Sequence, residues 1–118
     1  MTPEGKIKEM VKEELRKSGL IRTSKAAMAT ADNTGVYHMP VSNGMGVQGV
    51  NDFYGHYRGW YFTIETKVPG KDPTALQASQ IAANRITGAA TFVIRCAEDL
   101  QELQTWFRNV NKWYTLSQ

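Results

Sequence analysis

The fold is decided by residues 60–94, which read WYFTIETKVPGKDPTALQASQIAANRITGAATFVI. Aromatic and β-branched side chains predict a strand over residues 60–67. A helix follows, capped by Asp72 or Thr74 and ended by a glycine. The short apolar run at residues 90–94 is typical of a strand buried on both faces. Strand, helix and strand in this order predict a parallel pair joined by a right-handed crossover, and therefore an α/β fold.

The first half of the chain predicts one helix and one less regular segment. Residues 3–18 place Ile7, Val11 and Leu15 at helical spacing, with a Thr-Pro pair at the start and a glycine just past the end. Turn-forming residues dominate the segment that follows, residues 21–46. We expect an irregular hairpin or long loop there, around a short strand candidate at 37–41.

A hairpin is predicted between this segment and the crossover. Residues 47–54 and 60–67 are rich in β-branched and aromatic residues, as strands are. The intervening residues 55–59 begin and end with glycine and supply the turn. The two strands are therefore expected to pair with each other.

Two acids and a lysine in this hairpin are candidates for metal-assisted chemistry. A turn centred on residues 57–58 would pair Asp52 with Thr63 and place Glu65 diagonally on the same face, at about 5 to 8 Å. Lys67 shares that face, because side chains two apart in a strand point the same way. A hard cation such as Mg²⁺ prefers carboxylate oxygens. The alternative is a solvated charge pair between Glu65 and Lys67, with Asp52 an acid near the turn.

A second amphipathic helix is predicted over residues 98–114. It carries more aromatic surface than a small domain needs to cover itself, which predicts a subunit interface. The alternative is an ordinary helix packed on its own sheet. The stripe consists of Leu100, Leu103, Phe107 and Val110, continued by Trp106, Trp113 and Tyr114.

Length and composition set broad limits. A chain of 118 residues can bury one modest core, so residues 1–118 are expected to form a single domain. The net charge of +3 suits a polyanionic partner without identifying one. One cysteine, Cys96, excludes an intramolecular disulfide, and with two histidines no Cys/His zinc site is complete. No apolar run approaches the roughly 20 residues of a membrane span, so a soluble, intracellular protein is expected, without membrane association.

The motifs together resemble a known family. From GVND at residues 49–52, through IETKVPGKDPTALQ at 64–77, to Gly88-Ala89, the sequence resembles the VRR-NUC nucleases of the PD-(D/E)XK superfamily. These are virus-type replication and repair nucleases, which the chain resembles in order and spacing from about Glu4 to Leu103, and it looks like a stand-alone, phage-type member. The resemblance implies a restriction-endonuclease-like αβββαβ core, with a mixed sheet flanked by helices and an extra C-terminal helix. It also implies a homodimer that uses Mg²⁺, with Mn²⁺ able to substitute, to cut branched DNA such as Holliday junctions.

The resemblance assigns roles within the E-x-K strand and before it. Asp52 and Glu65 are the expected metal ligands, and Lys67 is the expected catalytic lysine. The backbone carbonyl near Thr66 is a further candidate ligand for the ion. The chain departs from the family pattern at Asn51, where a proline is usual, and at Thr66, where an aliphatic residue is common.

Two further site residues are carried over from the family. Gln77 matches the family's glutamine in the helix after the E-x-K strand, and Gln80 is the poorer match. Thr74 and Gln77 also fit a capping box, which is the structural alternative. Glu4 matches an acid of the first helix that would complete the metal shell through water. Its alternative role is to favour the positive end of the helix dipole.

Other functions remain open at this point. A non-catalytic nucleic-acid-binding module on the same fold would also suit the basic charge and the aromatic residues. A structural partner protein that assembles through the last helix is a third possibility. Four basic residues are able to contact phosphate, but their positions single out none of them. They are Lys25, Arg58, Lys71 and Arg108.

Overall fold

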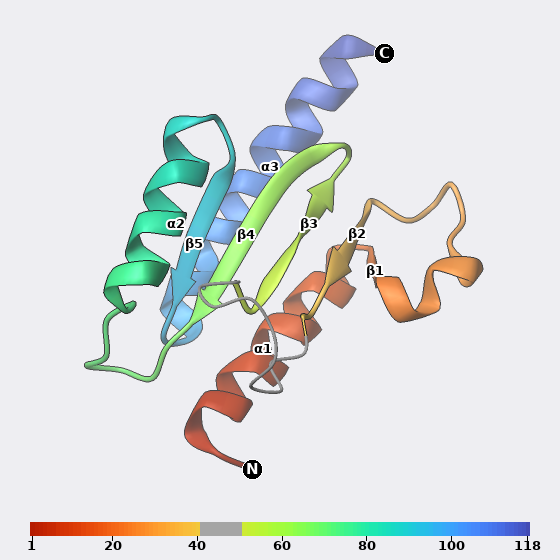
Figure 1. Ribbon diagram of the computed structural model, residues 1–118. Helices are drawn as coiled ribbons and strands as arrows, with labels where there is room; N and C mark the ends of the chain where they lie inside the picture. The colour runs from red at the N-terminus through yellow and green to blue at the C-terminus, as the bar shows by residue number, and fades with distance from the viewer. Residues whose placement is uncertain (41–50) are drawn as a thin grey trace.

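The computed structural model describes residues 1–40 and 51–118 and has the α/β fold predicted from the sequence (Figure 1). A five-stranded mixed sheet is flanked by helices, and the order of elements contains an αβββαβ core with one extra short strand and a C-terminal helix. The elements are α1 (Pro3–Lys17), β1 (Leu20–Arg22), the 3₁₀ helix η1 (Thr23–Met28), β2 (Gly35–His38), β3 (Phe53–Tyr57), β4 (Trp60–Thr66), α2 (Ala75–Ile86), β5 (Ala90–Ile94), the 3₁₀ turn η2 (Ala97–Asp99) and α3 (Leu100–Ser117).

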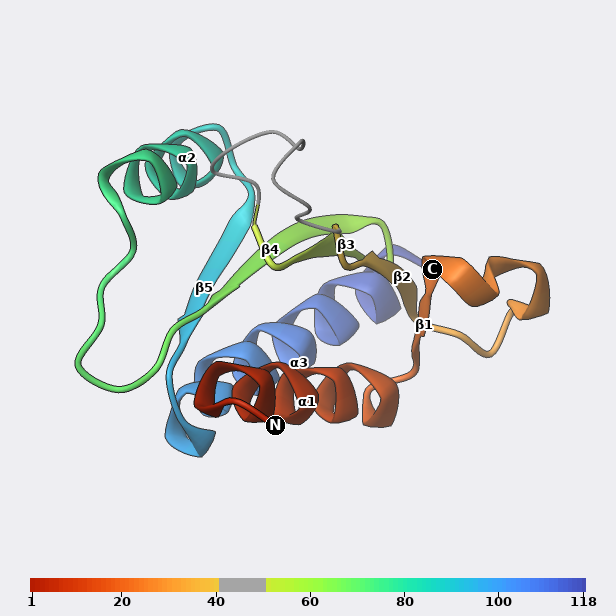
Figure 2. The ribbon, with the colours of Figure 1, turned by 60° about the horizontal axis from the view of Figure 1, so that its bottom comes forward.

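The strands lie in the sheet in their order along the chain. β3 pairs antiparallel with both β2 and β4, whereas β1–β2 and β4–β5 are parallel pairs. The parallel β4–β5 pair confirms the predicted strand, helix and strand unit. Figure 2 shows α2 on one face of the sheet and α1 with α3 on the other. One face of the sheet is therefore covered by a single helix and the other by two helices.

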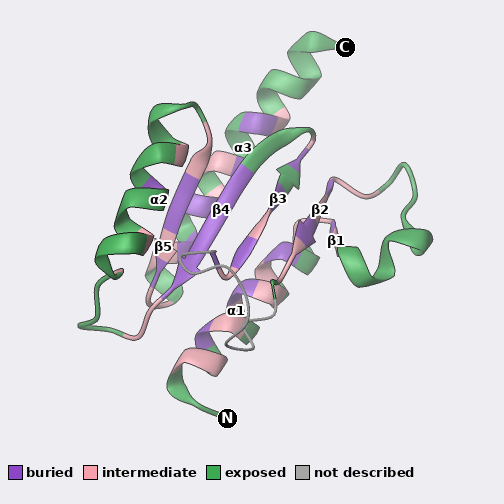
Figure 3. Cartoon of the chain, in the orientation of Figure 1, coloured by how far each residue is buried: buried purple, intermediate pink, exposed green. Residues whose placement is uncertain are grey.

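The hydrophobic core lies between the sheet and the α1–α3 layer. Figure 3 shows the buried stretches running along β4 and β5 and along the inner sides of α1 and α3. Alternate residues of β4 point into this core, as the period of a strand requires. The core residues of the three elements are Ile7, Val11 and Leu15 of α1, Phe62 and Ile64 of β4, and Leu100, Leu103, Phe107 and Val110 of α3.

Capping residues set the helix ends that the sequence predicts. The Thr2 hydroxyl accepts a hydrogen bond from the Gly5 N–H at 3.0 Å at the start of α1. Gly19 follows the end of α1 with φ of +93°, a conformation that glycine adopts at no steric cost. Thr74 caps α2 in the same way that Thr2 caps α1. Local sequence signals therefore account for where both helices begin.

α2 is loosely packed compared with α1 and α3. Of its three large apolar residues only Ile81 is buried, while Leu76 is 42% exposed and Ile86 is 88% exposed. Arg85 adds a bond from Nε to the Thr91 hydroxyl of β5, at 3.1 Å. Helices gain most of their stability from burying an apolar face, so α2 depends on few contacts. Those few contacts include one from Gln77, described below.

The β3–β4 turn differs from the prediction. Tyr57 pairs with Trp60, so the turn is Arg58-Gly59 and not residues 55–59. Both turn residues have positive φ, 49° and 85°, as the two-residue turns that match strand twist require. Gly55 instead lies within β3, where a Cβ atom would collide with the Val36 carbonyl oxygen of β2. Residues 47–50 of the predicted strand lie outside the described residues.

The changed turn also changes the register of the hairpin. Thr63 pairs with Tyr54, not with Asp52 as predicted, and Ile64 pairs with Phe53. Continued by one step, this register sets Asp52 opposite Glu65. The predicted register was therefore wrong by two residues. A shift of two keeps every side chain on its predicted face, so the expected meeting of the two acids is preserved.

The predicted long loop at residues 21–46 contains regular structure. β1 and β2 form the parallel edge of the sheet, and η1 lies between them. β2 begins at Gly35, two residues earlier than the predicted strand at 37–41, and residues 41–46 lie outside the described residues. The last helix also begins later than predicted, at Leu100, after η2. Within residues 1–40 and 51–118, no helix has the length and apolar character needed to cross a membrane.

Candidate active site

The candidate site lies where β3 begins and β4 ends. Asp52 immediately precedes β3, and its Oδ2 accepts hydrogen bonds from the Thr66 N–H at 2.8 Å and the Thr66 hydroxyl at 2.9 Å. Its Oδ1 lies 3.3 Å from Nζ of Lys8 on α1. Strand and helix therefore fix the Asp52 carboxylate in one orientation at the end of the sheet.

Glu65 is buried beside Asp52, with 2% of its surface exposed. Its Oε1 accepts a hydrogen bond from Gln77 Nε2 of α2 at 2.9 Å, and its Oε2 accepts a longer one from Asn51 Nδ2 at 3.5 Å. The alternative of a solvated surface charge pair with Lys67 is therefore wrong for Glu65. A carboxyl group this buried is rare in proteins without a partner that offsets its charge.

The electrostatics of Glu65 reflect its neighbours. Burial, then the charge of Asp52 and a hydrogen bond with it, raise the pKa of Glu65, which stands at about 8 against its ordinary 4.5. The Lys67 charge lowers this pKa, while the Glu4 charge raises it. The other three predicted charged residues, Asp52, Lys67 and Glu4, therefore all influence the Glu65 carboxyl group. A pKa shifted this far by burial and by a neighbouring charge is typical of functional sites.

Gln77 forms the predicted capping box and also contacts Glu65. Its side-chain oxygen accepts a hydrogen bond from the Thr74 N–H at 2.9 Å and completes the capping box of α2. Its side-chain amide nitrogen donates to Glu65. One amide group has both an acceptor and donors, so the two bonds do not compete. Gln77 thereby ties the start of α2 to the carboxyl group of Glu65.

We expect Gln77→Ala to lower the free energy of unfolding by about 1 to 3 kcal/mol, because it removes a cap and leaves a buried carboxyl group with one partner fewer. Urea denaturation monitored by circular dichroism measures the change. Gln80→Ala is the matched control on the same helix, since the Gln80 side chain is exposed. Equal effects of the two substitutions would contradict the role given to Gln77.

The remaining predicted residues surround this pair without joining it directly. Lys67 is half-buried, and its N–H donates to the Ile94 carbonyl at 3.1 Å, which fixes the backbone from which its amine extends. Glu4 lies in the first turn of α1. Within the described residues, no three His, Cys, Asp or Glu side chains lie close enough to hold one metal ion. The carboxylates at the site are therefore a pair, and the roles of Glu4 and of the Thr66 carbonyl stay predictions.

Sequence reasoning missed two residues that contact the acids. Asn51 was read only as a departure from the family pattern, yet its amide faces Glu65. Lys8 was not singled out, although it forms the ion pair with Asp52. Its position four residues after Glu4 on α1 was the only available signal, since residues four apart share a helix face.

Comparison with known proteins adds no family assignment. No family model matches the chain, and no curated protein or solved structure is significantly similar to it. The chemistry of the site is therefore argued from its geometry. Two carboxyl groups, a carboxamide and a nearby amine offer hard oxygen donors and a proton-transfer group at one end of the sheet.

Proposed function

We propose that this chain is a metal-dependent DNA endonuclease of the VRR-NUC type, which hydrolyses phosphodiester bonds. The observation that carries the proposal is the meeting of Asp52 and Glu65 at adjacent strand ends, within range of the Lys67 charge. Paired carboxylates with a neighbouring lysine are what metal-assisted phosphodiester hydrolysis requires. By family resemblance, the proposed substrate is branched DNA such as a Holliday junction.

The residues present fit a hard divalent cation. Burial and the Asp52 charge raise the pKa of Glu65 and so disfavour its anionic form, which the charge of a divalent ion would favour. Asp52 and Glu65 would hold Mg²⁺, with the Thr66 carbonyl as a further donor and Glu4 acting through water, and Mn²⁺ suits the same oxygen ligands. When bound, such an ion supplies Lewis acidity toward the phosphate.

The protein's own side chains would supply orientation and proton transfer. The Lys67 amine would hold the attacking water or take its proton, and would offset charge on the phosphate as the bond to the leaving oxygen weakens. Gln77 fixes the Glu65 carboxyl group through its amide, at 2.9 Å. Thr66 fixes Asp52 with two bonds. Both acids are thus held by hydrogen bonds from neighbouring residues before any substrate arrives.

A panel of labelled junction, flap, duplex and single-stranded DNA tests this function. We expect cleavage with Mg²⁺ or Mn²⁺ and none in EDTA, with the junction cut most rapidly. The alternative, a non-catalytic nucleic-acid-binding module, predicts a mobility shift without cleavage under the same conditions. That result, obtained with correctly folded protein, would overturn the enzymatic assignment.

We also propose that two copies of the chain associate, as the resemblance implies. Most of the predicted aromatic stripe is used inside the molecule: Phe107 is buried, and Trp106 packs against Phe62 and Phe92. Trp113 and Tyr114 remain partly exposed at the end of α3. Exposed aromatic residues of this kind favour an interface, and a monomer in sedimentation at micromolar concentration would contradict it.

A further inference from the structure

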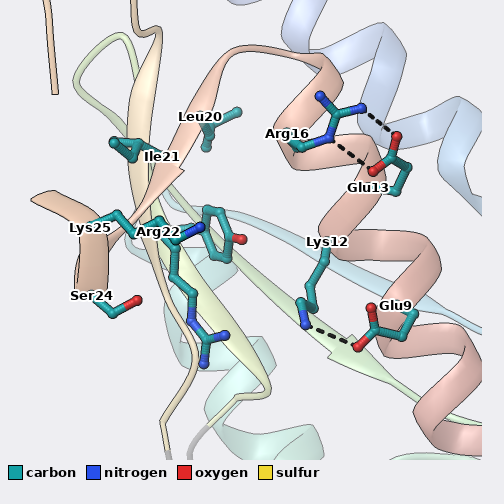
Figure 4. A pocket seen from close by; sticks show the side chains of 10 residues that line it. Glu9, Lys12, Glu13, Arg16, Leu20, Ile21, Arg22, Ser24 and Lys25 are labelled. Atoms are coloured by element: carbon teal, nitrogen blue, oxygen red, sulfur yellow. Dashed lines mark hydrogen bonds and ion pairs between the residues drawn. The ribbon is translucent and has the colours of Figure 1, made fainter. Parts of the chain in front are cut away.

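A hollow of about 430 Å³ lies between α1, β1 and the start of η1 (Figure 4). The residues that line it have a net charge of +2, compared with +3 for the whole chain. Much of the small net charge is therefore gathered at this place. The charged lining residues are Lys12, Arg16, Arg22, Lys25, Glu9 and Glu13.

The excess charge resides on the β1 and η1 side of the hollow. On α1, Lys12 pairs with Glu9 at 2.9 Å, and Arg16 pairs with Glu13 four residues further along the helix. Arg22 and Lys25 form no ion pair with any residue of 1–40 or 51–118. Figure 4 shows the Arg22 guanidinium extended along the hollow, free of the dashed contacts that join the α1 pairs. These two cations are available to an anionic ligand.

The hollow is connected to the candidate active site by one row of α1. Lys8, Lys12 and Arg16 are four residues apart and so lie along one side of the helix. Lys8 contacts Asp52, and the other two line the hollow. The row spans about 12 Å, a length over which one strand of B-form DNA carries roughly three to four phosphates.

We propose that this hollow binds backbone phosphates of the DNA strand beside the scissile bond, with Arg22 and Lys25 as the main contacts. The inference rests on the proposed function, because it takes DNA as the substrate. The Arg22 guanidinium offers the fork of N–H donors that matches two phosphate oxygens, and Lys25 adds a point charge. Contacts of this kind position the strand and read no base sequence.

Binding without catalysis tests the inference. Fluorescence anisotropy titrations of labelled junction and duplex DNA are made in EDTA, at salt concentrations between about 50 and 200 mM. Arg22→Ala/Lys25→Ala is expected to weaken binding about tenfold and to reduce the slope of log K against log salt by about two, roughly 0.9 for each lost phosphate contact. Arg22→Lys/Lys25→Arg keeps both charges and is expected to keep the slope.

The matched control removes the same amount of charge from the side of α1 that faces away from Lys8. Lys6 and Lys17 are exposed and lie on the side of the helix opposite Lys8, so Lys6→Ala/Lys17→Ala should leave the slope near that of the wild type. Equal losses in both double variants, or no loss at Arg22 and Lys25, would overturn the inference. DNA binding through the hollow without cleavage in Mg²⁺ would leave this inference standing while the proposed function fails. Cleavage at the wild-type rate by Arg22→Ala/Lys25→Ala protein would overturn this inference and leave the proposed function standing.

Discussion

Asp52→Asn is expected to reduce the rate of metal-dependent DNA cleavage by about three orders of magnitude. This is the typical rate loss when a charged group that supports bond cleavage is removed. Asparagine keeps an oxygen that accepts the Thr66 bonds, so the fold should be retained. It loses the negative charge that a divalent cation requires. Initial rates on a labelled junction in Mg²⁺ measure the effect, with circular dichroism as the check on folding.

Lys67→Ala should produce a similar loss, since it removes the amine that would handle the attacking water. Asp72→Asn serves as the control for both. Asp72 carries a largely exposed carboxylate that pairs with Arg95, and its substitution should leave the rate unchanged. Wild-type rates in either Asp52→Asn or Lys67→Ala protein would refute the assignment of the active site.

The stability of the metal-free protein is expected to fall as pH rises from about 5 to 8.5. Glu65 has a folded pKa of about 8 against an ordinary 4.5, so the folded state binds its proton more tightly. The stabilising contribution is complete below the ordinary pKa and is lost as pH rises through the folded one. Glu65→Gln should flatten this profile and make the protein more stable than wild type at pH 8.5, by an amount on the order of a few kcal/mol. Urea denaturation across this pH range measures it.

Mg²⁺ should reverse the loss of stability at high pH in the wild type, because a ligand that binds only the folded state stabilises it. Glu65→Gln protein should respond much less. Glu102→Gln, which alters an exposed carboxylate of α3, should follow the wild-type profile. Parallel pH profiles for wild type and Glu65→Gln would mean that Glu65 does not carry the proton.

The crossover unit could be predicted because its signals are local. Thr74 caps α2, and the apolar run at residues 90–94 gives β5 its observed bounds. The neighbouring elements follow from the same kind of signal, namely the period of the apolar residues in α1 and the capping residue before it. What these signals do not specify is how the strands align with one another.

The hairpin register required information from outside the hairpin. Gly55 and Gly59 look equally suited to a turn, but the need for Gly55 arises only where β3 approaches the β2 backbone. Arg58 adopts a left-handed conformation that few non-glycine residues take. An arginine in the sequence does not predict that conformation. The acids nevertheless meet as predicted, because the error in register was an even number of residues.

The contacts of the site could be predicted only in part. Gln77 and the two acids follow from the spacing of the motif, whereas Lys8 and Asn51 reach the site through tertiary packing. The hollow beside α1 combines residues from α1, β1 and η1, and the last two were expected to be irregular. Of its four cations, only Lys25 was a predicted phosphate contact, and its place in the fold was not predicted.

The Arg58-Gly59 turn links the alignment of the two acids to residues that lie at the other end of the hairpin. Arg58 is anchored by its N–H to the Thr34 carbonyl, by its Nε to Asn111 of α3 at 2.6 Å, and by contact with the Tyr114 ring. A slip of one residue in the pairing of β3 with β4 would turn the β3 side chains to the opposite face and separate Asp52 from Glu65. Asn111 and Tyr114 of the C-terminal helix thereby support the alignment of the hairpin, so mutations there are expected to alter how the two acids meet without touching either acid.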